Sequence, residues 1–269
     1  MPIGAVASPT IATANPVVNA VARLSQDIAD STYRLASGQR LTRAGDDPAS
    51  LSTAQQLQAQ ISGLRQGLLN TTVADSLLQV AAQALETING LLEEQKALAA
   101  EAAAGGPTNR QRAFLDTSFQ SIRQRIDALV AETRFGNVAL LDGSASPFAF
   151  TVGAEPPISL SIGDVSSATL FGGATPELTS QTAAQLAEPI VDEAIAIVGQ
   201  ERAKIGATQS ALNAADRILS ANIFSLDTAR SALIGTDIAS ETTRLNALTI
   251  RQKTTLSIAA QTQTFSSDL

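Results

Sequence analysis

The sequence predicts a mainly α-helical protein, an elongated antiparallel helical bundle or coiled coil formed by the N- and C-terminal regions, with a small β-hairpin insert. Apolar residues recur at heptad spacing from about Val17 to Ala104 and again from about Thr182 to Thr264. Between these regions the apolar period changes to two. Aromatic residues make up only 3% of the chain although hydrophobic residues make up 44%, which favours thin, closely packed helices.

The first helix is expected to begin near Val17 and to stop at Gly38, a residue suited to a helix C-terminus. Ser31 occupies one position of its apolar seam, so the seam is weak and needs a partner helix. The seam consists of Val17, Val21, Leu24, Ile28 and Leu35.

A linker then leads to a second, much longer helix. Asp47 suits the N-cap position, because its carboxylate can accept the free N–H groups of the first turn, and Pro48 suits the first helical position. The pattern predicts a helix from Pro48 to Ala104, closed by two glycines and a proline. Its expected seam is Leu57, Ile61, Leu64, Leu68, Val73, Leu77, Val80, Ala84, Ile88 and Leu91.

The rest of the chain contains two further helical regions around the insert. A third helix is expected from about Asn109 to Glu132. Phe148, Phe150 and Val152 alternate with polar or small residues, as do Ile158, Leu160 and Ile162, which predicts a β-hairpin within an insert at about 138–175. The last region carries heptad positions at Ile205, Leu212, Ala215, Leu219, Leu226, Ala229 and Leu233, and Gly235 interrupts it. We therefore expect a terminal domain of residues 1–44 with 235–269 and a central domain of residues 45–234.

Composition argues against several classes of function. The chain has no His and no Cys, which removes the commonest general base, thiolate catalysis and the usual transition-metal ligands. A net charge of −7 disfavours nucleic acid as a partner, and no apolar stretch is long enough to span a bilayer. We therefore expect neither catalytic, cofactor-binding nor metal-binding residues.

Three segments give the chain a family resemblance. Residues 34–51, RLASGQRLTRAGDDPASL, resemble the Leu-x-Ser-Gly-x-Arg run of bacterial flagellins, the subunits of the flagellar filament. Residues 133–143, TRFGNVALLDG, and 236–241, TDIASE, resemble two further flagellin segments. The chain looks like a short flagellin whose outer domains are reduced to one hairpin.

The resemblance implies a structural function. It implies a subunit that polymerises with itself into an extracellular filament for swimming motility, exported unfolded through the flagellar type III pathway. It also implies contacts with an export chaperone and with hook-associated junction and cap proteins. The alternative is the hook–filament junction protein, which shares the terminal helices. An enzyme or a ligand-binding helical domain is the least favoured hypothesis, since the sequence has no His, no Cys, no convergent acids and no Gly-rich phosphate loop before a helix.

The candidate site residues follow from these interpretations. Helix capping and a hinge are expected at Gly38, Asp46, Asp47, Pro48 and Gly235. Asp46 and Asp47 could instead bind a metal or act in catalysis, but adjacent acids point in different directions. Subunit contacts, or simply solvated surface, are expected at Arg34, Arg40 and Arg43 with Asp237 and Glu241. By family resemblance, the insert hydroxyls of Ser144, Ser146, Ser166, Ser167, Thr169 and Thr175 are candidates for O-glycosylation.

Overall fold

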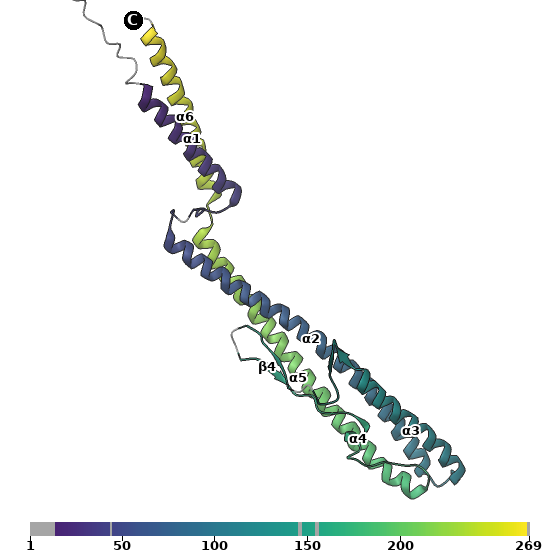
Figure 1. The fold of residues 1–269 in the computed structure, drawn as a ribbon. Coiled ribbons are helices and arrows are strands. Elements are labelled where there is room, and N and C mark those ends of the chain that lie inside the picture. The colour runs from purple at the N-terminus through teal and green to yellow at the C-terminus, as the bar shows by residue number, and fades with distance from the viewer. Residues whose placement is uncertain (1–13, 44, 145–146, 154–155, 268–269) are drawn as a thin grey trace, which may run out of the picture. The chain divides into compact units, whose positions relative to one another are not determined.

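The computed structural model describes residues 14–43, 45–144, 147–153 and 156–267. This part of the chain forms helices and two short strand pairs, which confirms the mainly α class and the hairpin insert (Figure 1). The helices are α1 (Ala14–Ser37), α2 (Pro48–Ala103), α3 (Asn109–Glu132), α4 (Ser167–Leu170), α5 (Gln181–Ile234) and α6 (Ile238–Ser267). The bounds of α2 and α3 lie within one residue of the predicted ones, because prolines, glycines and capping side chains mark their ends.

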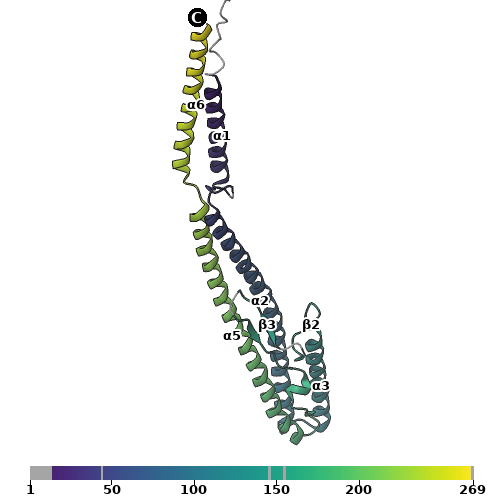
Figure 2. The same cartoon turned by 60° about the vertical axis from the view of Figure 1, so that its left-hand side comes forward.

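The chain divides into two compact units, one of Met1–Gln60 with Ser225–Leu269 and one of Ile61–Phe224. In the terminal unit α1 and α6 lie side by side (Figures 1 and 2). They run antiparallel, since Ser31 contacts Glu241 at one end and Ser25 contacts Gln252 farther along. A small apolar cluster of Leu41, Ala54 and Ile234 lies near the junction of these helices. The domain boundaries at residues 44 and 235 remain a prediction.

The central unit has one continuous core built from α2, α3, α5 and the insert. α5 buries a heptad row from Ala184 to Leu219, which includes the predicted Ile205 and Leu212. Beyond it the predicted positions Leu226 and Leu233 are half-buried, and the prediction is wrong at Ala229, which is exposed. α3 buries Phe119, Ile122 and Ile126 (Figure 2 shows the helix beside α2). The full buried heptad row of α5 is Ala184, Val191, Val198, Ile205, Leu212 and Leu219.

The predicted seam of α2 is wrong at two positions. Val73 is 54% exposed and Val80 is 40% exposed. Their next neighbours Ala74 and Ala81 are fully buried instead. The reason is that α2 packs on more than one side, so its buried stripe is wider than a two-helix seam, and alanines allow the closest approach of backbones.

The insert contains the predicted hairpin and two elements that the sequence pattern did not reveal. β3 (Phe148–Phe150) pairs antiparallel with β4 (Ile158–Leu160), with Phe148 opposite Leu160. The strands β1 (Arg134–Phe135) and β2 (Val138–Ala139) form a second antiparallel pair. Both this pair and α4 are too short to produce a periodic pattern in the sequence.

Candidate functional site

The turn that joins α1 to the rest of the terminal unit lies against the break between α5 and α6. Gly38 has a φ of +67°, a backbone conformation that residues other than glycine rarely adopt. Its carbonyl accepts the Thr236 N–H at 3.0 Å, and the Arg40 N–H donates to the Ile234 carbonyl at 2.6 Å. Gln39, just after α1, and Gly235, between α5 and α6, form an isolated antiparallel β-bridge. The two glycines that the sequence singled out therefore lie in one junction.

Asp46 and Asp47 serve different backbone groups of the linker. Asp46 Oδ2 accepts the N–H groups of Thr42 and Arg43, each at 3.1 Å, which closes the loop before α2. Asp47 Oδ1 accepts the Ser50 N–H at 3.1 Å and Oδ2 accepts the Ser50 hydroxyl at 2.6 Å, the geometry of an N-cap. The backbone bonds from Arg43 and Thr42 lower the pKa of Asp46, and the Ser50 hydroxyl and N–H lower that of Asp47. Both carboxylates are thus engaged in shaping the chain.

The three arginines of the linker region differ in what they contact. Arg43 forms an ion pair at 2.7 Å with Asp30, a residue of α1 in the same chain. Arg40 Nη2 donates to the Leu233 carbonyl at 3.1 Å. Arg34 is half-buried, and its Nε has no hydrogen-bond partner among the described residues. Unlike Arg40 and Arg43, Arg34 has a buried Nε–H group that no described residue accepts.

The two acids expected to receive those arginines have partners within the terminal unit. Asp237 accepts the N–H groups of Ala239 and Ser240 and so caps α6. Glu241 is 8% exposed and accepts the Ser31 hydroxyl at 2.7 Å. The contact between Ser31 and Glu241 was missed from the sequence, where Ser31 signals only a gap in an apolar seam.

The pair of α1 and α6 leaves much apolar surface open. Within its described residues, buried side chains are few: Ser31 on α1, and Glu241 and Leu248 on α6. The α1 seam residues are only half-buried. Large apolar side chains exposed by about half or more line both helices: Val18, Tyr33, Ile238, Ile250, Leu256 and Ile258. With so few buried side chains and several large apolar ones exposed, the pair of α1 and α6 has little core of its own and would gain stability from a partner.

The hydroxyls of the insert are not equally accessible. Ser167 is 4% exposed, and its hydroxyl donates to Asp127 at 2.8 Å, so it is a poor glycosylation candidate in the folded chain. Ser144, Thr169 and Thr175 are exposed, and Ser166 is half-buried. Ser146 lies outside the described residues.

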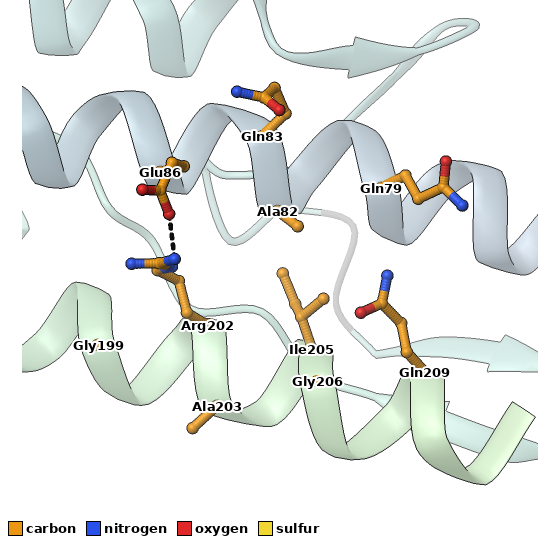
Figure 3. Close-up of a pocket in the computed structure, with 10 residues that line it drawn as sticks. All are labelled: Gln79, Ala82, Gln83, Glu86, Gly199, Arg202, Ala203, Ile205, Gly206 and Gln209. Carbon is orange, nitrogen blue, oxygen red and sulfur yellow. Dashed lines mark ion pairs between the residues drawn. The ribbon is translucent and has the colours of Figure 1, made fainter. Parts of the chain in front are cut away.

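A shallow groove of about 870 Å³ runs between α2 and α5 in the central unit (Figure 3). Ala82 and Ile205 face each other across it, and Glu86 pairs with Arg202 at one end. The remaining polar lining residues are amides: Gln79, Gln83 and Gln209. None of these groups is a nucleophile beside a base, so the groove offers no catalytic constellation.

Two other kinds of site are absent from the described part of the chain, a metal site and a membrane-spanning helix. No group of three acidic residues there is close enough to hold a metal ion. None of the described helices has the length and hydropathy needed to cross a bilayer.

Two family models match most of the chain. The bacterial flagellin N-terminal helical region matches residues 10–146, and the bacterial flagellin C-terminal helical region matches residues 189–269. Residues 147–188, which include the β3–β4 hairpin and the start of α5, lie between the two matches.

Individual flagellins are similar over nearly the whole length. A flagellin of Bacillus subtilis is 30% identical, with 91% of this chain and 93% of the relative covered. A flagellin of Halalkalibacterium halodurans is 29% identical over 85% of each chain. The crystal structure of Bacillus cereus flagellin is 26% identical, with a TM-score of 0.50 over 57% of this chain and 88% of that one. A putative flagellar hook-associated protein from Vibrio parahaemolyticus has a TM-score of 0.62 at 15% identity, over 71% of this chain and 100% of that one, and shares the fold.

Proposed function

Because the chain belongs to the bacterial flagellin family, we propose that its copies join through the exposed apolar side chains of α1 and α6. As a flagellin, the chain is a structural subunit of the extracellular flagellar filament that drives swimming, and it is not an enzyme. The junction protein is not favoured, because the models and relatives that match are flagellins.

The exposure of α1 and α6 is the observation that carries this proposal. Ile250 is 65% exposed and Ile258 is 53% exposed, although both belong to a helix that already packs against α1. Burying a side chain of this size stabilises a structure by about 1.5–3 kcal/mol. Contacts between different faces of identical subunits need not close into a ring, so they can continue into a filament.

Substitution of Ile250 tests the proposed surface. Ile250→Asn should leave the helical content of the monomer unchanged, because the side chain is exposed, and should prevent the growth of long filaments from purified protein. Ile250→Val, which keeps an apolar side chain, is the matched control and should assemble. Electron microscopy and sedimentation measure the outcome. Normal filaments from Ile250→Asn would place the contact elsewhere.

We also propose that the junction residues Gly38, Asp46, Asp47, Pro48 and Gly235 form a hinge between the terminal domain and the central domain. The positive φ of Gly38 and the two capping carboxylates support this assignment. In a hinge, a few loop residues between two helices change their φ and ψ angles while the helices stay rigid. Helices that end at defined residues confine this change to the linker.

Arg34 is the arginine that we assign to a contact between subunits. Arg40 and Arg43 have partners in their own chain, whereas Arg34 has no side-chain hydrogen bond or ion pair among the described residues. Its Nε is buried, so a contact with another copy would use the Nη groups at the end of the half-buried side chain. Asp237 is exposed and remains a candidate acceptor on another copy, whereas Glu241 is buried and would have to leave Ser31 to serve as one. Arg34→Glu should slow assembly and Arg34→Lys should restore part of it; equal assembly by both would reject the contact.

The remaining partners are proposals from the family. An export chaperone would cover the apolar face of α6 before secretion through the type III pathway, and the hook-associated junction and cap proteins would contact the first and last subunits. If the chaperone uses the proposed face, Ile250→Asn should weaken its binding and Ile250→Val should not. Equal chaperone affinity for both variants, measured by calorimetry, would separate the chaperone site from the assembly surface.

A further inference from the structure

A single polar side chain lies in the middle of the apolar seam between α2 and α3. Gln95 is 0% exposed, and the buried residues of its core include Leu92, Ala99 and Phe119. α2 and α3 lie side by side in both views of the fold (Figures 1 and 2). A leucine or methionine at this position would continue the seam without interruption.

The Gln95 amide is only half satisfied. Its Nε2 donates to the Phe119 carbonyl at 3.0 Å, but no protein group donates to its Oε1 among the described residues. Turning the amide over would bring Oε1 against the Phe119 carbonyl oxygen, and both atoms are acceptors, so the orientation is fixed. A buried carbonyl oxygen without a donor makes the folded state less stable.

The other buried polar side chains of the described central unit behave differently. The Thr71 and Thr208 hydroxyls donate to carbonyls one turn back in their own helices. Arg112 donates to two carbonyls at the end of α2, and Glu201 accepts from Gly163 and Lys204. Gln95 therefore differs from these buried polar side chains in having a buried oxygen atom without a hydrogen-bond donor.

We propose that Gln95 is a built-in weak point that keeps the folded monomer easy to unfold, so that the chain can be exported. This inference rests on the proposed function, since a subunit secreted as an unfolded chain must not be trapped in a stable fold. The core around Gln95 is thin: the buried α2 residues one and two turns after it, Ala99 and Ala102, are alanines. A modest local penalty is then a sizeable part of the total stability.

Replacing Gln95 by methionine measures the penalty directly. Met has a similar length and no polar atom, so Gln95→Met should raise the folded-to-unfolded ratio by a factor of about 5–30. The melting temperature of the full-length monomer should rise by about 2–8 °C. Gln83→Met is the matched control, because Gln83 is exposed on the same helix, and its melting temperature should stay within about 2 °C of the wild type.

Secretion tests the biological half of the proposal. In a flagellated host without its own flagellin, Gln95→Met should show a smaller secreted fraction than Gln83→Met at equal cytoplasmic level. If Gln95→Met does not fold, Gln95→Leu takes its place. A lower melting temperature for both Gln95 variants would overturn the weak point, and a higher one with unchanged secretion would overturn its role in export. Assembly of the wild-type chain into filaments is measured separately, so failure of the proposed function remains distinguishable.

Discussion

Gly67 and Gly90 lie on the same helix but should respond oppositely to the same substitution. Both are in α2, where alanine is favoured over glycine by about 1 kcal/mol. A Cβ on Gly90 would meet nothing within 4 Å. A Cβ on Gly67 would lie 2.8 Å from the backbone nitrogen of Gly153, in the turn after β3. Gly67 is thus the point at which the hairpin packs directly on the backbone of α2.

The size of the difference follows from these contacts. Gly90→Ala should raise the free energy of unfolding by about 1 kcal/mol through helix propensity alone. Gly67→Ala gains the same propensity but loses about 1–3 kcal/mol to overpacking, because a backbone atom cannot rotate away as a flexible side chain can. The hydrogen bond of 3.0 Å from Asn70 to the Thr151 carbonyl holds the hairpin at this place and limits its retreat. We therefore expect Gly67→Ala to be less stable than Gly90→Ala by about 1–3 kcal/mol.

Urea unfolding of the two full-length variants, followed by circular dichroism, measures this difference. The midpoint should move up for Gly90→Ala and should stay or move down for Gly67→Ala, with similar slopes. Gly63→Ala repeats the control on an open position of α2. The packing argument is falsified if Gly67→Ala stabilises the chain as much as Gly90→Ala and Gly63→Ala do.

Four further outcomes are expected. Asp47→Ala should speed amide exchange in the first turn of α2 more than Asp47→Asn does; equal damage by both would favour a role that needs the charge. Because bonds from Ser50 lower the folded pKa of Asp47, this stabilisation is present above the ordinary pKa of 3.8 and is lost as pH falls below it, so that turn should exchange faster in acid. Gly38→Val should alter filament shape in electron micrographs, since φ there is +67°, and unchanged filaments would remove Gly38 from the hinge. Glycosylation at exposed hydroxyls such as Ser144 and Thr175 should raise the intact mass of filaments above 27.7 kDa, and a bare mass would dismiss it.

Local chemistry explains why the sequence could predict most helix ends. The α3 N-terminus carries a capping box in which Thr108 and Gln111 satisfy each other's backbone N–H groups. Pro48 and Gly38 mark their helix ends through fixed or positive φ values. Interactions of this kind join residues no more than four positions apart, so helix ends can be predicted from them without knowledge of the tertiary structure.

The contacts that hold the insert could not be predicted from the local sequence. Three acids on helices hold its irregular chain by accepting backbone N–H groups: Glu201 accepts from Gly163, Asp127 from Ser167, and Asp116 from Leu178. The partners are 38 to 62 residues apart in the chain. Nothing in the local sequence distinguishes these acids from solvated ones. The bonds from Ser167 to Asp127 could therefore not be foreseen, and Ser167 was expected to be an exposed hydroxyl.

The two units divide the tasks of a filament subunit by their surface chemistry. Residues 61–224 carry the whole net charge of −7, whereas acids and bases balance in residues 1–60 with 225–269. Copies can therefore approach through the terminal unit without a net charge to oppose them, while like charges repel between central units. The terminal unit also holds α1 and α6, whose apolar side chains remain exposed and whose polar link between Ser31 and Glu241 fixes the register of the pair. If copies join through this weak, neutral and apolar pair, as we propose, burial against neighbouring copies supplies most of its stability and drives assembly.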